Sequence, residues 1–365
     1  MGSLYDNSGE DIYARRDIEK RRKHAMAMKK KRKRQILKRK IMLFTGAAAI
    51  LVASLGLTAA VRKNNTASGS SLNPKETQQV AIDANADAAN DDNIDKKDEK
   101  KFVYAQKSSD YKEITDAAVR TPYVALLDVN NNKIIAGREA ESRIYPASMT
   151  KVMSLIVAVE NVKDVTKMYQ FTNKLLYPLY NAQASVAGFG TNEIVLVSDL
   201  FYGMILPSGA DAAAALAEIV AGSEEQFAVL MNKKCEELGL KNTHFVNSTG
   251  LYDDEQYTTP SEMAMIMEYA ECAKVLSTFQ YTTEKTTQHP DGILLTNTMF
   301  SRMYGTEVEG VTITAGKTGY TDEALNCLVS YAVKGDKSYI CVTSHAHNKW
   351  HCIFDSFEIY GNYLP

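Results

Sequence analysis

A serine and a lysine three residues apart, Ser148 and Lys151, open an apolar stretch of the chain. They lie in YPASMTK, residues 145–151, and the next nine residues, VMSLIVAVE, are almost all apolar. Side chains at positions i and i+3 of a helix share one face, so the hydroxyl and the amine would meet. An apolar setting disfavours the ammonium form, and a neutral lysine can take the proton that a serine nucleophile must lose. The N–H groups at the helix start would favour an oxyanion at Ser148.

A second candidate element, Lys317-Thr318-Gly319, follows the β-rich residues VTITA near the end of the chain. A lysine on a strand edge, a neighbouring hydroxyl and a glycine that admits another backbone suit an extended peptide ending in a carboxylate. Lys317 and Thr318 would hold that carboxylate. The backbone N–H of Tyr320 would be the second oxyanion donor, beside that of Ser148.

Other candidate sites in the sequence are weaker. Ser109 and Lys112 repeat the S-x-x-K spacing, but they lie at the polar end of a linker with no apolar helix behind them. His345 and His347 would share one face of a strand, yet no third ligand accompanies them, so no metal site is expected. No G-x-S-x-G sequence is present, which argues against an ordinary esterase triad.

The elements that must position these residues follow from the hydrophobic patterns. Residues 124–129 and 133–137 predict a strand hairpin around three asparagines, and the Ser148 helix follows. Helical patterns then predict a mostly helical middle, with Ser223 and Thr259 as N-caps and Gly239 as a stop. Strands return over 310–321, 324–333 and 338–346, and a helix is expected over 349–364. These elements predict an α+β fold, an antiparallel five-stranded sheet flanked by helices with a mostly helical insertion.

From about Pro122 onward the chain resembles the D-alanyl-D-alanine carboxypeptidases, which are low-molecular-mass serine penicillin-binding proteins of the β-lactamase/transpeptidase-like superfamily. The similarity includes both motifs and the segments ALLDVNNNKIIAGREAESRIYPASMTK, LPSGADAAAALAE, FAVLMNKKCEELGLKNTHFVNSTGL, YTTPSEMA and GKTGYTDEALNCLVS. The resemblance implies that Ser148 attacks the carbonyl between two D-alanines of a peptidoglycan stem peptide. Water then hydrolyses the acyl-enzyme, β-lactams acylate the same serine, and no cofactor is needed.

The chain departs from the family at its second motif, which is usually Ser-x-Asn. Here the residues are Ser208-Gly209-Ala210. By the resemblance Ser208 joins a proton relay between the two lysines, whereas the asparagine amide that would contact Lys151 and the substrate is missing. Losing such a contact costs about 1–3 kcal/mol, or about ten- to a hundredfold in rate. Asp211 is either a compensating polar group or an acid at a helix N-terminus.

Several functions therefore stay open beside carboxypeptidase activity. A catalytically weakened penicillin-binding or cell-wall interaction module would keep the fold, and D,D-endopeptidase or transpeptidase activity would use the same chemistry. Nothing in the sequence matches the Glu-x-x-Leu-Asn loop by which class A β-lactamases activate water, which argues against an efficient β-lactamase.

The first hundred residues differ from the rest in composition. Residues 15–40 are densely basic, and the uncharged run 41–61 is long enough to cross a bilayer. Positive charge on one flank keeps that flank inside the cell. We therefore expect a basic cytoplasmic tail over 1–40, a single transmembrane helix over 41–61, and an extracellular remainder. A secretory signal cleaved near residues 58–60 is the alternative.

The basic block alone would also suit nucleic acid, but its position against the uncharged run argues against such a partner. Residues 62–101 are rich in Asn, Ser, Asp, Ala and Lys without an apolar period, which predicts a disordered linker. Residues 102–365 would then form the exported catalytic domain.

The five cysteines follow the linker and show no C-x-x-C spacing. An odd number in this arrangement indicates neither a disulfide framework nor a zinc pattern. Buried free thiols are expected, with one disulfide among Cys327, Cys341 and Cys352 as the alternative.

Overall fold

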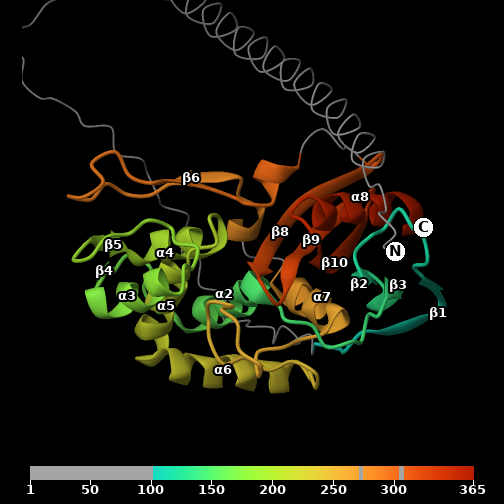
Figure 1. Ribbon diagram of the computed structural model, residues 1–365, viewed down its shortest axis with the longest axis horizontal. Helices are drawn as coiled ribbons and strands as arrows, with labels where there is room; N and C mark the ends of the chain where they lie inside the picture. Colours follow the sequence, from blue (N-terminus) through green and yellow to red (C-terminus); the bar gives the residue numbers. More distant parts are fainter. Residues whose placement is uncertain (1–101, 271–273, 304–307) are drawn as a thin grey trace, which may run out of the picture. The chain divides into compact units, whose positions relative to one another are not determined.

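The computed structural model describes residues 102–270, 274–303 and 308–365 (Figure 1). The predictions for the tail over 1–40, the membrane span over 41–61 and the linker over 62–101 lie outside these residues. Within the described part, no helix is long and apolar enough to cross a membrane. Residues 102–365 form one compact unit.

The chain folds into a mixed six-stranded sheet with helices on both faces, so the expected α+β class is correct. The strand order is β1-β3-β2-β10-β9-β8, and all neighbouring strands are antiparallel except β1 and β3, which are parallel. The prediction of five antiparallel strands was therefore one strand short. The strands of this sheet are β1 (Gln106–Glu113), β2 (Tyr123–Asp128), β3 (Lys133–Arg138), β8 (Val311–Thr321), β9 (Leu325–Lys334) and β10 (Lys337–Ala346).

The extra strand β1 contains the second S-x-x-K match. Ser109 and Lys112 lie on this edge strand, where successive side chains point to opposite faces, so the match has no helical geometry. β1 is polar and largely exposed, which is why its sequence resembles the linker before it.

The sheet is buried on both faces because helices cover each side. β2 illustrates this, since Val124 and Leu126 pack in a cluster with α8 while Leu127 packs in the core that contains α7. Side chains alternate along a strand, so an uninterrupted apolar run marks a strand covered on both sides. The helices are α2 (Thr150–Asn161), α3 (Asn173–Asn181), α4 (Val197–Ile205), α5 (Ala210–Ala221), α6 (Glu224–Glu237), α7 (Pro260–Tyr269) and α8 (His351–Tyr363).

Helices α3 to α6 form the predicted helical insertion, to the left of the sheet in Figure 1. The expected caps are present: the Ser223 side chain accepts a hydrogen bond from the Gln226 N–H, and the Thr259 side chain accepts one from Glu262. Gly239, with φ of +70°, follows the end of α6. Two small two-stranded sheets were not predicted, β4 (Met168–Gln170) with β5 (Ile194–Leu196), and β6 (Gln280–Thr282) with β7 (Leu294–Thr296).

Short 3₁₀ turns complete the fold: η1 (Ala147–Met149), η2 (Lys274–Ser277) and η3 (Phe300–Arg302). The turn η1 packs against β8, which is an edge strand of the sheet. This contact brings the start of α2 to the free edge of β8.

Four cysteines lie in the described part, and all are buried free thiols, as expected. They are Cys235, Cys327, Cys341 and Cys352. The alternative of a disulfide among the last three is wrong.

Candidate active site

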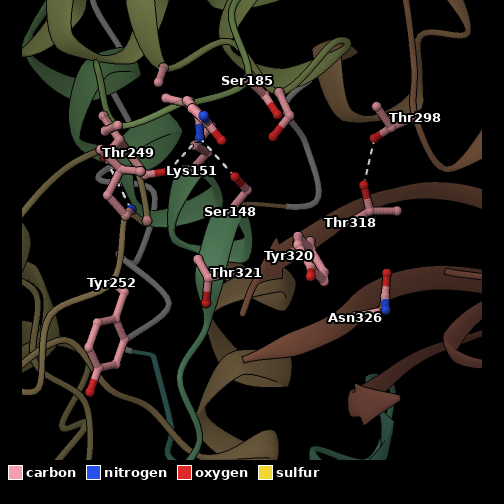
Figure 2. A pocket seen from close by; sticks show the side chains of 18 of the residues that line it. Ser148, Lys151, Ser185, Thr249, Tyr252, Thr298, Thr318, Tyr320, Thr321 and Asn326 are labelled. Atoms are coloured by element: carbon pink, nitrogen blue, oxygen red, sulfur yellow. Dashed lines mark hydrogen bonds between the residues drawn. The ribbon is translucent and has the colours of Figure 1, made fainter. Parts of the chain in front are cut away.

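Ser148 and Lys151 meet as the i, i+3 spacing predicts. The Lys151 Nζ lies 3.0 Å from the Ser148 Oγ and also donates a hydrogen bond to the carbonyl oxygen of Thr249 (Figure 2). The local structure differs from the prediction in one detail, because Ser148 lies in the 3₁₀ turn η1 and the α-helix begins only at Thr150. The side chains of Ser148 and Lys151 still lie next to each other, because residues i and i+3 also eclipse in a 3₁₀ turn.

Lys151 is buried among apolar residues, and only 1% of it is exposed. Burial is the largest influence on its amine and lowers its pKa to about 7, although the carboxylates of Asp211 and Glu224 act in the opposite direction. A substantial fraction of the amine is therefore neutral near pH 7 and able to accept the proton of Ser148.

The loop that holds Thr249 was not identified as part of the site from the sequence. The Asn247 side-chain oxygen accepts hydrogen bonds from the backbone N–H groups of Thr249 and Gly250, at 3.1 and 2.7 Å. The Ser248 hydroxyl and N–H donate to Glu224. These bonds fix the position of the Thr249 carbonyl group, and this carbonyl group orients the Lys151 amine by accepting its hydrogen bond.

Lys317 approaches from the opposite side, from β8. Its Nζ donates to the Ser208 Oγ and to its neighbour's carbonyl oxygen, that of Thr318, both at 2.7 Å. Burial lowers the pKa of Lys317 well below its ordinary value, and the nearby charges of Lys151 and Arg302 lower it further. Ser208 has a φ of +69°, so the backbone is strained where it presents its hydroxyl to Lys317.

The turn that carries Ser148 lies directly against β8 at Gly319. A Cβ atom at Gly319 would come within 3.0 Å of both the Ser148 amide nitrogen and the Pro146 carbonyl oxygen. A side chain at this position would require the turn to shift by a few tenths of an ångström, so glycine favours the close approach. The predicted pair of N–H donors, from Ser148 and Tyr320, consequently belongs to adjacent backbone segments.

A cavity of about 620 Å³ opens in front of these residues. It is lined by Ser148, Lys151, Ser208, Thr318, Gly319 and Tyr320, whereas Lys317 lies behind this wall and is 1% exposed. Every predicted site residue is therefore in the cavity wall or hydrogen-bonded to it. Sequence reasoning did not identify the other polar residues of the wall, which include Ser185, Thr249, Thr298, Arg302 and Asn326.

Thr298 has a direct relation to the K-T-G motif. Its Oγ1 lies 2.6 Å from the Thr318 Oγ1, a hydrogen bond drawn as a dashed line in Figure 2, and both residues line the cavity. Arg302, in the turn after Thr298, adds a cationic side chain to the same part of the wall. Two hydroxyls and a guanidinium form a suitable environment for a carboxylate.

Ala210, which replaces the usual asparagine of the second motif, lies in the cavity wall. Ala210 lines the cavity with a methyl group, and its N–H donates to the Ser185 carbonyl oxygen at 2.7 Å. Asp211 does not replace the missing amide, because its carboxylate is fully buried and accepts from the N–H groups of Ala187 and Gly188. Asp211 is thus an acid in the first turn of α5 that holds the cavity wall, as the alternative interpretation stated.

The arrangement can carry out acyl transfer without a metal. It combines a serine with a partly neutral lysine at 3.0 Å, a second serine–lysine pair at 2.7 Å, and backbone N–H groups beside the nucleophile. Within the described residues, no group of three or more His, Cys, Asp or Glu side chains is placed to hold a metal ion.

Comparison with known proteins supports this chemistry. A protein-family model described as D-alanyl-D-alanine carboxypeptidase matches residues 110–348. The chain is 32% identical over 245 residues to the D-alanyl-D-alanine carboxypeptidase DacF of Bacillus subtilis, covering 64% of this chain and 59% of that protein. It is also 32% identical over 234 residues to DacA of Escherichia coli, covering 59% of this chain and 53% of that protein. The chain therefore spans little more than half the length of these curated relatives.

Solved structures show the same fold. The DD-transpeptidase of Streptomyces K15 superposes with a TM-score of 0.59 at 25% identity, over 69% of this chain and 100% of that one. Penicillin binding protein 5 from Haemophilus influenzae gives a TM-score of 0.59 at 27% identity, over 68% of this chain and 71% of that one.

Proposed function

Because the chain belongs to the D-alanyl-D-alanine carboxypeptidase family, we propose that it is a serine D,D-carboxypeptidase that removes the terminal D-alanine from peptidoglycan stem peptides. The observation that carries this proposal is the contact of Ser148 with Lys151 at 3.0 Å, in a site where burial lowers the pKa of the lysine to about 7. A serine with such a partner is an activated nucleophile.

In the first half of the reaction, neutral Lys151 takes the hydroxyl proton while the Ser148 Oγ attacks the carbonyl carbon between the two D-alanines. The N–H groups of Ser148 and Tyr320 stabilise the resulting oxyanion. The C–N bond then breaks, and the proton held by Lys151 passes through the Ser208 hydroxyl, which accepts from Lys317, to the leaving amine of D-alanine, so Lys151 is neutral again. The product is an ester between Ser148 and the shortened peptide.

In the second half, a water molecule attacks the same carbonyl carbon and Lys151 again accepts the proton. The C–O bond to Ser148 breaks, and the serine regains its proton. No cofactor takes part. The methyl group of Ala210 offers no polar contact to either step, so this enzyme should be slow.

The substrate would extend β8 as an added strand. β8 is an edge strand, and its residues Thr318 to Thr321 line the cavity. An extended peptide pairs with such an edge through its backbone. Its terminal carboxylate would lie at the Thr318 hydroxyl, with Lys317 behind the cavity wall.

Penicillin labelling and release of D-alanine test this function. The full-length protein should form a covalent adduct with a fluorescent penicillin and should release D-alanine from a peptide ending in D-Ala-D-Ala. Ser148→Ala should abolish both. Ser109→Ala is a matched control, because it removes the other S-x-x-K serine and should change neither. An adduct that persists in Ser148→Ala would place the nucleophile elsewhere.

We further propose that residues 41–61 anchor the protein in the cell membrane as a single transmembrane helix, with residues 1–40 in the cytoplasm and the catalytic domain, residues 102–365, outside. The uncharged run and the basic flank before it support this proposal. Mass spectrometry of the mature N-terminus tests it, since a cleaved signal would leave a chain that starts near residue 60.

A weakened module that binds but does not turn over is the second candidate, and Ala210 is the observation that favours it. Complete inactivity is harder to reconcile with the intact hydrogen bonds of Ser148, Lys151, Ser208 and Lys317. Transpeptidase or endopeptidase activity would use the same acyl-enzyme, with an amine in place of water or with a cross-linked substrate.

A further inference from the structure

Glu224 is a half-buried carboxylate near the serine–lysine pair that takes no part in the reaction steps above. It is the first residue of α6, directly after the N-cap Ser223. Its Oε1 accepts hydrogen bonds from the Ser248 N–H at 2.7 Å and from the Ser248 hydroxyl at 2.8 Å. Glu224 lies outside the lining of the cavity. It can therefore act on the reaction only through its neighbours or through its charge.

Ser248 connects Glu224 to the helix that carries Lys151. It is completely buried, and its carbonyl oxygen accepts from the Ser154 hydroxyl at 2.7 Å. Ser154 lies three residues after Lys151 on α2, so the two side chains share one face of the helix. Lys151 donates to the carbonyl oxygen of the next loop residue, Thr249. Two side chains of α2 are therefore bound to consecutive carbonyl groups, and Glu224 holds the same segment from α6.

The carboxylate also acts on Lys151 through its charge. Burial is the largest influence on Glu224 and raises its pKa, whereas hydrogen bonds from Ser248 and the charge of Lys151 lower it. The effect is reciprocal, because the charge of Glu224 raises the pKa of Lys151 against the larger effect of burial. The N–H and hydroxyl donors of Ser248 both favour the charged form of the carboxylate. The negative charge therefore keeps Lys151 a stronger base than burial alone would allow.

The hydrogen bonds limit the distance between this charge and the amine. Glu224 binds the N–H of Ser248, and the carbonyl group that binds Lys151 belongs to the next residue, Thr249. Two residues of extended chain span at most about 7 Å, and two hydrogen bonds add about 3 Å each, which gives a limit of about 13 Å. At this separation, with an effective dielectric constant of about 20, one unit charge moves a titration midpoint by about one pH unit.

We propose that Glu224 is a positioning residue for the nucleophile and its base. Its carboxylate holds the segment of Ser248 and Thr249 against α2, so that the Thr249 carbonyl orients the Lys151 amine. Its negative charge makes this amine a better proton acceptor. The inference rests on the proposed carboxypeptidase function and deepens it, because it assigns a residue outside the cavity to the acylation step. Glu224 itself neither gains nor loses a proton in this role.

Glu224→Gln tests the role of the charge, because it removes the charge and keeps the shape of the side chain. The amide oxygen of glutamine can still accept from the Ser248 N–H. The rate constant for penicillin acylation of the full-length protein is measured from pH 5 to pH 10. The midpoint of the pH profile should fall by about one pH unit, and the plateau at high pH should fall about threefold because the base is weaker. An unchanged midpoint would overturn the proposal.

Glu225→Gln is the matched control. It removes one carboxylate from the same first turn of α6, where Glu225 is exposed. The midpoint and the plateau of this variant should equal those of wild type. A midpoint that falls as far as in Glu224→Gln would show that net charge or the helix terminus sets the profile, and would refute the assignment to Glu224.

Ser248→Ala tests the positioning role separately from the charge. It removes the hydroxyl donor to Glu224 and leaves the carboxylate in place. The plateau should fall about three- to tenfold, because the Thr249 carbonyl is held less firmly, while the midpoint stays at its wild-type value. A midpoint that moves as far as in Glu224→Gln would refute the role of the charge, and a normal plateau would refute the positioning role.

Penicillin labelling of wild type separates this proposal from the proposed function. An adduct at Ser148 in wild type, together with an unchanged midpoint in Glu224→Gln, would refute the role of Glu224 and leave the function intact. Absence of the adduct in wild type would refute the function, and the role of Glu224 would fall with it.

Discussion

Gly250 provides a direct test of how the backbone positions the nucleophile. Its φ is +79°, and a Cβ atom built on it would lie 2.0 Å from the Ala147 carbonyl oxygen and 2.9 Å from the Ser148 amide nitrogen. Both contacts are with backbone atoms of the turn η1, which cannot rotate away as a side chain does. Gly250→Ala must therefore displace either its own loop or the turn that carries Ser148.

Two energetic contributions add in this variant. A non-glycine residue in the left-handed region costs about 1 kcal/mol, and forcing a methyl group into a closely packed site costs about 1–3 kcal/mol more. The total loss in the free energy of unfolding is about 2–4 kcal/mol. Relief of the 2.0 Å contact also requires a shift on the order of 1 Å, and a misplacement of this size lowers the acylation rate about a hundredfold.

Gly239→Ala is a matched control, because Gly239 also has a left-handed φ, +70°, but no atom lies within 4 Å of the added Cβ. It should lose only about 1 kcal/mol and should react normally with penicillin. Urea unfolding gives the stabilities, and the second-order rate constant for penicillin acylation gives the activity. Normal acylation by folded Gly250→Ala would refute the claim that this glycine sets the position of Ser148.

Three further predictions concern the lysines and their partners. The rate of penicillin acylation should rise with pH with a midpoint near pH 7, because Lys151 must be neutral to accept the proton and burial lowers its pKa to about 7. A midpoint near pH 10 would contradict this. Ala210→Asn should raise kcat/KM for D-Ala-D-Ala peptides about ten- to a hundredfold by restoring a polar contact, and a protein inactive in both forms would instead be a binding module. Ser208→Ala and Ser208→Gly should both slow acylation, because each removes the hydroxyl that is hydrogen-bonded to Lys317. The glycine variant should be about 1 kcal/mol more stable than the alanine variant in thermal unfolding, because glycine relieves the strain of the positive φ at this position.

The sequence predicted those parts of the site that depend on regular periodicity. Ser148 and Lys151 meet because the i, i+3 relation holds in both kinds of helical turn. The strands that carry Lys317 and its neighbours have long β-rich runs, and the caps at Ser223 and Thr259 have a specific side-chain signature. Their positions therefore follow from local patterns.

The missing parts of the prediction depend on features without a local pattern. The three-residue strands of the β4–β5 and β6–β7 sheets are too short to show alternation, and β1 is polar because it lies at the edge of the sheet. The carbonyl group of Thr249 accepts from Lys151, but any residue has a carbonyl group, so the sequence gives no sign of this role. In the sequence Asp211 looks like an ordinary acid at a helix N-terminus. Only the structure shows that its carboxylate accepts a hydrogen bond from the Ala187 N–H.

Lys151 links the catalytic role of the site to the stability of the whole fold. Burial lowers its pKa from 10.5 to about 7, so between these pH values the unfolded chain binds a proton that the folded chain does not. The free energy of unfolding must then rise with pH in this window, by about 2 kcal/mol between pH 7 and pH 9 from this residue. Lys151→Met is similar in shape and does not titrate.

The comparison of wild type with Lys151→Met should therefore show a difference in slope, whatever the absolute stability of the variant. Removing the amine leaves the Thr249 carbonyl without its donor, which offsets part of the gain from removing a buried amine. This offset does not depend on pH, so it cancels when stability at pH 9 is compared with stability at pH 7. Urea unfolding at the two pH values should give a stability increase about 2 kcal/mol larger for wild type than for Lys151→Met. Parallel changes in the two proteins would mean that Lys151 keeps its ordinary pKa in the folded state, and a charged lysine could not act as the base for Ser148.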